Sequence, residues 1–359
     1  MTLAEAPART GFHTLRVAGV ERLCDDAVAV TFAVPDHLRS AFAFRPGQYL
    51  TLRTMRDDIE ERRSYSICAP AGAAPRVGVR RVTDGLFSEW LVDRLAEGDE
   101  LEVAPPAGSF TPDLLPGTHH GLIAAGSGIT PVLSIVASVL GAHPDTQVAL
   151  LYGNRRTDTV MFTEELADLK NAYGPRLQLI HTLSREPMAA EIASGRLDAD
   201  RIGRIVDALV DVEDVDEWWL CGPLGMTTDA RTVLLERGVS PQRVHRELFY
   251  VDEPPPEVVR EEPGVDGATS EVTIVLEGRT TTLTLPRAEP ILDAAQHVRA
   301  DLPFACKGGV CGTCRARVTT GEVVMRRNFA LEDDELAAGF VLTCQARPTT
   351  DAVTVDYDS

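Results

Sequence analysis

Four cysteines in the last sixty residues constrain this chain more than any other feature. Three of them form a C-x4-C-x2-C run, and the fourth follows at a distance. They are Cys306, Cys311, Cys314 and Cys344. This spacing is typical of thiolates that hold a [2Fe–2S] cluster. Three ligands must converge from one short loop, and Gly308, Gly309 and Gly312 remove side chains that would block the close approach of the backbone.

Other uses of these cysteines fit the pattern less well. Zinc also accepts four thiolates, but its common sites pair two C-x2-C units and this segment has only one. Four unrelated thiols would be a coincidence in a chain with seven Cys in total. Disulfides are disfavoured because that number is odd and the first ten residues lack the apolar core of a signal peptide. We therefore expect a reducing, cytoplasmic compartment.

Composition limits the functional classes further. With 359 residues and 44% hydrophobic content, the chain can bury two or three cores. Its formal net charge of -19 argues against nucleic-acid binding, which needs a basic surface. Residues 121–142 carry no charged side chain, but Gly and Pro interrupt their first half. This stretch predicts a buried strand, a tight turn and a buried helix, so no membrane association is expected.

Changes in pattern divide the chain into four parts. Residues 11–115 show short alternating or β-branched runs separated by turn residues, which predicts an antiparallel β-barrel. In residues 116–250 apolar strands alternate with helical stretches, which predicts a parallel α/β sheet. Residues 251–270 are rich in Pro, Glu and Asp and predict an acidic linker. Residues 271–359 predict an α+β domain around the cysteine loop.

Two glycine turns in the α/β part are candidate phosphate-binding sites. Gly126, Gly128 and Thr130 lie between an apolar strand and an apolar helix, so free amides and the positive helix end can face a pyrophosphate. The spacing is not G-x-G-x-x-G, and the turn can also be an ordinary connection. Cys221 and Gly222 end a later strand, where ligands of parallel sheets bind. Cys221 can equally be a buried structural thiol.

Two motifs in the barrel part are candidate flavin contacts. Strand alternation places Arg63 and Tyr65 on one face, where the Arg can pair with a diphosphate and the Tyr can pack on a flavin. Gly85 and Ser88 lie where a strand turns into a short helix, whose first amides can hold another phosphate. The alternatives are an ordinary half-buried strand for the first motif and an N-cap role for Ser88.

Taken in order, these motifs resemble the ferredoxin–NADP reductase superfamily in its oxygenase-reductase form. The shared patterns are R-x-Y-S at 63–66, G-x-x-S-x-x-L at 85–91, G-x-G-x-T-P at 126–131, C-G-x-x-G-M at 221–226 and the plant-type ferredoxin segment. Further strings are similar to the family of bacterial phenylacetyl-CoA epoxidase reductases. These are YGNRRT at 152–157, SRE at 184–186, ELF at 247–249 and CKGGVCGTCRA at 306–316. The resemblance covers nearly the whole chain.

The resemblance implies a fold and an activity. It implies a FAD-binding barrel, an NAD(P)H-binding α/β domain and a β-grasp ferredoxin domain. The implied enzyme passes electrons from NADPH through FAD and the [2Fe–2S] cluster to a multisubunit di-iron oxygenase, the phenylacetyl-CoA epoxidase of phenylacetate degradation. Two alternatives remain: an NADH-dependent reductase of a Rieske-type oxygenase acting on steroids or aromatic acids, and a non-catalytic electron carrier or zinc-stabilised module.

The resemblance also implies roles for single residues around the flavin. Arg63 would bind the FAD diphosphate, Tyr65 would pack on the flavin, and Ser66 would lie near N5, where hydride arrives. Gly85 and Ser88 match the second FAD contact, and this segment favours FAD over FMN.

Around the nicotinamide cofactor, the implied contacts are Gly126, Gly128, Thr130, Cys221 and Gly222. Phe249 would be the aromatic side chain beside the isoalloxazine, with core packing as the alternative. The expected catalytic residues are Ser66, Cys221 and Phe249.

Charge decides between the two nicotinamide cofactors. A 2′-phosphate needs cations where NAD enzymes place a carboxylate on the ribose. Arg155 follows one expected strand and Ser184 and Arg185 follow the next, and the resemblance implies that the Ser-Arg pair contacts this phosphate. We expect NADPH, while Asp158 and Glu186 nearby leave NADH open.

Net charge also bears on the electron acceptor. Residues 251–359 hold 19 Asp and Glu against 10 Lys and Arg, a balance of -9. This balance favours a basic docking surface on the partner, so electron delivery to the oxygenase is expected to weaken as salt is added. The acidic linker would keep the ferredoxin part near the flavin while leaving it free to dock elsewhere.

Overall fold

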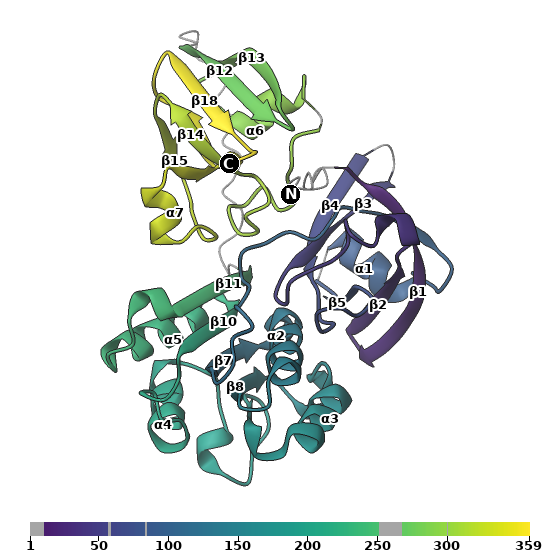
Figure 1. Ribbon diagram of the computed structural model, residues 1–359, viewed down its shortest axis with the longest axis vertical. Helices are drawn as coiled ribbons and strands as arrows, with labels where there is room; N and C mark the ends of the chain where they lie inside the picture. The colour runs from purple at the N-terminus through teal and green to yellow at the C-terminus, as the bar shows by residue number, and fades with distance from the viewer. Residues whose placement is uncertain (1–10, 57–58, 83–84, 251–267, 300) are drawn as a thin grey trace, which may run out of the picture. The chain divides into compact units, whose positions relative to one another are not determined.

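A computed structural model describes residues 11–56, 59–82, 85–250, 268–299 and 301–359. The chain forms two compact units (Figure 1). One holds the α/β part and the barrel except for Arg62–Ser64, and the other holds the C-terminal part together with Arg62–Ser64. Residues 251–267 of the expected linker lie outside the described residues.

The N-terminal part is a six-stranded antiparallel sheet in the order β4-β3-β6-β1-β2-β5. Its strands are β1 (His13–Cys24), β2 (Ala27–Ala33), β3 (Tyr49–Arg56), β4 (Ile59–Ser66), β5 (Arg76–Arg80) and β6 (Glu100–Val103). Helix α1 (Leu86–Asp93) packs its Phe87 and Leu91 into the core that these strands enclose. The prediction of an antiparallel barrel-like sheet is confirmed.

The second part is a five-stranded parallel sheet in the order β11-β10-β7-β8-β9. Its strands are β7 (His119–Ala125), β8 (Gln147–Asn154), β9 (Leu177–Leu183), β10 (Glu217–Pro223) and β11 (Val244–Tyr250). Helices α2 (Ile129–Ala142) and α3 (Thr163–Tyr173) share one core cluster with the sheet. Helices α4 (Ala199–Leu209) and α5 (Leu224–Glu236) share another. The strand order reverses between β7 and β10, which is where ligands bind in such sheets.

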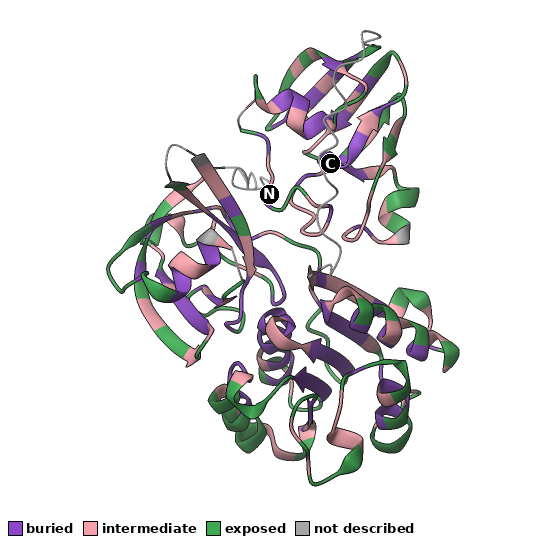
Figure 2. Cartoon of the chain, turned by 180° about the vertical axis from the view of Figure 1, so that it is seen from behind, coloured by how far each residue is buried: buried purple, intermediate pink, exposed green. Residues whose placement is uncertain are grey.

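The uncharged stretch at 121–142 folds as predicted, into β7, a single 3-10 turn (Gly126–Gly128) and the buried helix α2. Figure 2 shows buried residues along the strands of this sheet. Among the helices of the described residues, none combines the length and apolar character that a membrane span needs.

The C-terminal part is a mixed sheet in the order β13-β12-β18-β14-β16, with a separate ribbon of β15 and β17. The strands are β12 (Thr269–Leu276), β13 (Arg279–Pro286), β14 (Arg315–Thr320), β15 (Val323–Met325), β16 (Phe340–Leu342), β17 (Ala346–Pro348) and β18 (Ala352–Asp356). Helices α6 (Ile291–Gln296) and α7 (Asp333–Ala337) complete it. Because β12 begins at Thr269, the last two residues expected in the linker are strand; they pair with β13, whose Leu285 and Pro286 face them.

The barrel and the α/β part are joined by close packing along α2. Ser134 Oγ donates a hydrogen bond to the carbonyl oxygen of Ala69 at 2.6 Å, and Ser138 Oγ accepts one from the Ala71 amide at 2.9 Å. On β5, a Cβ at Gly78 would lie 2.4 Å from Thr130 Cγ2 and 3.0 Å from the Phe162 ring. These contacts fix the barrel against α2.

We expect Gly78→Ala to destabilise the protein by about 1–3 kcal/mol, because Thr130 and Phe162 are buried and cannot move aside without cost. Thermal unfolding measures the change. The control is Gly19→Ala on β1, where a Cβ would meet no atom within 4 Å. A variant at Gly78 as stable as the control would show that the two parts separate freely.

Candidate active site and metal centre

The two glycine turns of the α/β part meet at the carboxyl ends of β7 and β10. A Cβ on Gly128 would lie 2.2 Å from the carbonyl oxygen of Cys221, so only glycine fits between the turn and the strand end. Thr130 Oγ1 donates to the carbonyl of Ser127 at 3.0 Å, and the Tyr152 hydroxyl donates to the carbonyl of Gly126 at 3.1 Å. The turn is therefore held from inside, and its outer face is left to a ligand.

Gly222 follows Cys221 at the end of β10. A Cβ there would lie 2.6 Å from Met226 Cε and 3.3 Å from the Ala125 amide nitrogen. Both Gly128 and Gly222 thus permit close backbone approach where the strand order reverses, as the sequence motifs predict. The thiol of Cys221 is fully buried, and burial followed by the charge of Glu247 raises its pKa.

Glu247 is a residue that the sequence analysis missed as a site residue. It pairs in register with Cys221, and its Oε2 accepts a hydrogen bond from Ser66 Oγ at 3.4 Å. Although Glu247 keeps some exposed surface, it lies deep in the molecule, and this burial raises the pKa of its carboxyl to about 8 against the lowering effect of the Ser66 hydrogen bond. The sequence contained a sign of this role, because an acidic side chain near the apolar end of a buried strand is costly unless it is paired or functional.

Ser66, Cys221 and Glu247 come from three different strands. Ser66 is the last residue of β4 and is 4% exposed. The structure therefore brings two of the expected catalytic residues to one acid. A neutral carboxyl and a hydroxyl in a buried place can orient a cofactor and hold a proton there.

The flavin motifs of the barrel lie on β4 and at the start of α1. Arg63 and Tyr65 occupy alternate positions of β4, and the Tyr65 ring lies 6.3 Å from that of Phe87 on α1. Gly85 is the N-cap of α1, so the alternative N-cap role for Ser88 is wrong. Ser88 Oγ instead accepts from the Val82 amide at 3.0 Å and donates to the Gly85 carbonyl at 2.9 Å. Its hydroxyl shapes the loop, which leaves the amides of the first helical turn for a phosphate.

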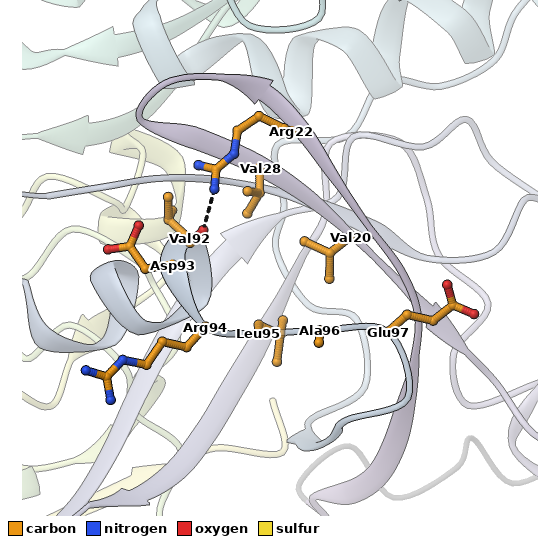
Figure 3. Close-up of a pocket in the computed structure, with 9 residues that line it drawn as sticks. All are labelled: Val20, Arg22, Val28, Val92, Asp93, Arg94, Leu95, Ala96 and Glu97. Atoms are coloured by element: carbon orange, nitrogen blue, oxygen red, sulfur yellow. Dashed lines mark hydrogen bonds between the residues drawn. The ribbon is translucent and has the colours of Figure 1, made fainter.

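A cavity of about 450 Å³ lies elsewhere on the barrel (Figure 3). It is bordered by Val20 and Val28 and by the chain after α1, and it contains none of the expected site residues. Within it Arg22 Nη2 donates to the Val92 carbonyl at 3.0 Å, which satisfies a carbonyl of the last turn of α1. The Arg22 hydrogen bond holds the end of α1, and the cavity is separate from the flavin motifs.

The expected 2′-phosphate residues gather after β8 and β9. The Arg185 amide donates to the Arg155 carbonyl at 2.8 Å, which sets the two loops side by side. Ser184, Arg155 and Arg185 are exposed, and within the described ranges neither arginine forms an ion pair.

The nearby acids have other partners. Glu186 lies 3.4 Å from Arg156 and accepts from the Thr157 hydroxyl and amide, and these hydrogen bonds lower the pKa of its carboxyl. Asp158 lies 3.3 Å from the same Arg156. Asp158 and Glu186, the two acids that kept NADH as an alternative, therefore interact with Arg156. Arg155 and Arg185 form no ion pair with them and can bind a phosphate.

The four cysteines of the C-terminal part converge from one loop and the start of the β17 segment. Lys307 and Gly309 turn the loop with positive φ angles of 52° and 78°. This geometry directs the amides of Gly308 and Cys311 at Cys306 Sγ, at 3.3 and 3.4 Å. Gln345 Nε2 approaches Cys344 Sγ at 3.7 Å.

The thiols lie in two pairs. Cys306 hydrogen-bonds with Cys311, and Cys314 with Cys344. The bond with Cys311, aided by backbone amides, lowers the pKa of Cys306 to about 5, and the bond with Cys314 lowers the pKa of Cys344. Four cysteine sulfurs with amide donors around Cys306 are a ligand set that a two-iron cluster would bind as thiolates once their protons are released, so the residues fit the expected group.

Comparison with known protein families matches all three parts. Residues 14–111 match the oxidoreductase FAD-binding domain, and residues 122–232 match the oxidoreductase NAD-binding domain. Residues 274–349 match the 2Fe-2S iron-sulfur cluster binding domain.

Relatives match from end to end. A component of 1,2-phenylacetyl-CoA epoxidase from Escherichia coli K12 is 42% identical over 98% of this chain and 99% of its own length. The chain belongs to the family of FAD- and [2Fe–2S]-containing oxygenase reductases. The ferredoxin reductase component of 3-ketosteroid-9-alpha-monooxygenase from Rhodococcus rhodochrous is 37% identical to this reductase over 99% of the chain and 100% of its length.

A solved structure supports the fold of this reductase. Phthalate dioxygenase reductase, described as a modular structure for electron transfer from pyridine nucleotides to [2Fe-2S], covers 96% of this chain and 98% of its own, with a TM-score of 0.60 and 21% identity. The expected family, fold class and oxidoreductase activity are confirmed, as are FAD, a nicotinamide nucleotide and the cluster as its cofactors.

Phe249 was expected beside the isoalloxazine. It is partly buried on β11 and packs against the core cluster that contains Cys221 and Trp219. Core packing is therefore at least part of its role in the reductase.

Proposed function

We propose that this reductase draws electrons from NADPH and delivers them to the di-iron oxygenase component of a phenylacetyl-CoA epoxidase. The observation that carries the proposal is the 42% identity to the Escherichia coli epoxidase component over 98% of the chain. Seven cysteines without a disulfide in the described residues, four of them the proposed cluster ligands, support a reducing, cytoplasmic location. The substrate of the oxygenase would bind to the partner, since the reductase supplies electrons only.

FAD would be held by the barrel. Bound there, it would supply the chemistry of accepting two electrons as hydride and releasing them singly. Arg63 would pair with its diphosphate, Tyr65 would pack along it, and the first-turn amides behind Gly85 would face its phosphate. Ser88 would act through the shape of that loop.

The nicotinamide would lie over the ends of β7 and β10. Gly126, Gly128 and Thr130 present the outer face of their turn to the pyrophosphate, and Cys221 and Gly222 form the floor under the reactive ring. Glu247 would keep its proton on the carboxyl at neutral pH, and the Ser66 hydroxyl would orient it. Phe249 would support this floor from the core side.

Arg155, Ser184 and Arg185 would bind the 2′-phosphate of NADPH. Their exposure, and the occupation of Asp158 and Glu186 by Arg156, support this assignment. Two guanidinium groups and a hydroxyl match a dianionic phosphate, whereas a ribose hydroxyl would be matched by a carboxylate.

Arg185→Ala is expected to raise the apparent KM for NADPH about 10-fold, with little change for NADH, because one charge-assisted contact to the phosphate is lost. Steady-state cytochrome c reduction with each nucleotide measures both values. Arg204→Ala on α4, which removes an exposed arginine paired only with Asp200, is the charge control. Equal changes for the two nucleotides would refute the assignment.

Reconstitution tests the proposed partner. The purified protein should show flavin and [2Fe–2S] absorbance that NADPH bleaches, and it should support turnover of phenylacetyl-CoA with the candidate epoxidase oxygenase. Cytochrome c reduction is the control for a working reductase. Bleaching and cytochrome c reduction without phenylacetyl-CoA turnover would reject this partner.

A second partner is supported by the 37% identity to the 3-ketosteroid-9-alpha-monooxygenase reductase component. The same assay with a 3-ketosteroid monooxygenase oxygenase component decides between the two. The partner that gives the higher coupled rate at equal reductase concentration is the one assigned.

A further inference from the structure

A small ribbon in the ferredoxin part presents an exposed face beside the cluster loop. It pairs β15 with β17, and Val324 lies directly across from Arg347. Val324 is 53% exposed, while its neighbours in both strands are more buried. Cross-strand partners share one side of a sheet, so Val324 and Arg347 lie on the same outward face.

This face continues into the cluster loop. The Arg326 amide donates to the Gln345 carbonyl at 3.1 Å, which extends the ladder by one pair. Arg326 follows Val324 by two positions and Gln345 precedes Arg347 by two, so both lie on the Val324 side of the ribbon. Arg326 is exposed there, whereas Gln345 is buried against the cluster loop. The Gln345 side chain reaches the Lys307 carbonyl at 2.9 Å and Cys344 Sγ at 3.7 Å. The outward face of the ribbon therefore borders the Cys344 side of the cluster.

The arginines of this face differ from four other cations of the ferredoxin part, whereas Arg279 and Arg317 likewise form no ion pair within the described ranges. Four cations are paired with acids of their own part, namely Arg287 with Asp351, Arg299 with Asp301, Lys307 with Asp293 and Arg315 with Glu335. Arg326 and Arg347 form no ion pair with any residue of the described ranges, and Arg347 Nε is buried without a hydrogen-bond partner. We call Val324, Arg326 and Arg347 the ribbon patch.

The ribbon patch combines one exposed apolar side chain with two arginines that form no ion pair in the described residues. It therefore suits a partner surface on which carboxylates surround an apolar centre. One acid, Glu322, lies two residues before Val324 on the side away from the loop, so the patch keeps a positive balance. Arginine is favoured at such contacts because its planar group binds carboxylates with two hydrogen bonds. The position next to Cys344 would bring the partner to the cluster edge.

We propose that the ribbon patch is the docking surface for an acidic patch on the acceptor oxygenase. The inference rests on the proposed function, since it supposes an oxygenase acceptor. It differs in sign from the expectation based on the net charge of residues 251–359, because four acids of the ferredoxin part pair with its other cations and the patch holds two arginines against one nearby acid, Glu322. The contact is local, and within a Debye length it outweighs the distant net charge.

Two haem proteins of opposite charge test the patch without the oxygenase. The acidic cytochrome b5 and the basic cytochrome c are reduced by NADPH through the full-length holoenzyme at low ionic strength. For Arg326→Ala combined with Arg347→Ala, we expect about 3- to 10-fold slower reduction of cytochrome b5, and unchanged or faster reduction of cytochrome c. The loss should disappear at high salt.

Arg279→Ala is the matched control, because Arg279 opens β13 on a different sheet and is also exposed without an ion pair in the described residues. It should leave both rates unchanged. A redox titration of the cluster should give the same potential for all variants, which separates docking from tuning of the cluster. Equal losses with both haem proteins, equal effects of the control, or no loss at all would overturn the patch.

Turnover with the candidate oxygenase completes the test. If the double variant also lowers that coupled rate, the patch serves the proposed partner. If cytochrome b5 reduction falls but the wild-type protein drives neither oxygenase, the proposed partner fails while the patch stands. If wild type drives the oxygenase and the double variant drives it equally well, the patch is not its docking site.

Discussion

Cys314→Ala is expected to leave reduction of FAD by NADPH unchanged and to lower electron delivery to the oxygenase by about 100-fold or more, because one iron of the cluster loses a ligand. Cys314 is 3% exposed and forms a pair with Cys344, so no other thiol can take its place. The residues proposed for hydride transfer lie in the other compact unit. Stopped-flow bleaching of the flavin and coupled oxygenase turnover measure the two steps separately.

Cys24→Ala provides the matched control. Cys24 is half-buried in the barrel, where its thiol hydrogen-bonds with Asp26 at 3.1 Å. Its loss should leave both flavin reduction and electron delivery within about twofold of wild type, since the hydrogen bonds of this thiol with Asp26 and Arg80 contribute little. Delivery that survives in Cys314→Ala, or that fails equally in the control, would contradict a cluster held by the four C-terminal cysteines.

Glu247→Gln is expected to slow reduction of FAD by about 100-fold, because the amide could not supply the proton that FAD would take up together with the hydride. It should also flatten the pH dependence. In wild type the carboxyl is neutral below its pKa of about 8, and at higher pH its negative charge would oppose an arriving hydride. The wild-type rate should therefore fall as the pH rises through about 8. Stopped-flow flavin reduction between pH 6 and 9 measures this profile.

Stability should change with pH in the same window. The folded protein holds the Glu247 proton up to about pH 8, whereas the unfolded chain releases it near the ordinary glutamate pKa of 4.5. The contribution of Glu247 to stability is therefore greatest below pH 4.5, the pKa of this group in the unfolded chain. It declines as the pH rises to about 8, the pKa of this group in the folded protein. Glu247→Gln should remove this decline in thermal unfolding.

Glu217→Gln is the control on the same sheet. Glu217 pairs with His245 at 2.8 Å at the opposite ends of these strands, where the carboxyl is partly exposed. It should keep both the wild-type rate and its pH profile. A pH profile for Glu247→Gln that matches wild type would assign the titration to another group.

Local spacing was enough to predict the cluster and the glycine turn between β7 and α2. Three cysteines within nine positions must share one loop, so Cys306, Cys311 and Cys314 indicate their chemistry without a fold. The turn at Gly126 and Gly128 could likewise be found between an apolar strand and an apolar helix, because both signals are local in the chain. The strand and helix alternation that predicted the parallel sheet is of the same kind.

Contacts between distant residues became known only from the folded chain. Glu247 meets two of the expected site residues because β11 pairs with β10 and sets it opposite Cys221, while Ser66 reaches it from 181 positions away in the sequence. Its raised pKa comes from burial, which a sequence does not state. Ser88 could be placed near a phosphate from its motif, but which atoms its hydroxyl binds depended on the folded loop.

Charge gives the clearest example of what the sequence determines and what only the folded structure decides. The number of acids and bases, and hence a negative ferredoxin part, can be counted from the amino-acid sequence alone. Which of these charges cancel is fixed only in three dimensions, where Lys307 finds Asp293 and Arg315 finds Glu335, and where Arg326 and Arg347 are left beside the cluster. The two levels differ because net charge adds along the chain, whereas electrostatic interaction depends on distance and is largely screened beyond about 8–10 Å at physiological ionic strength.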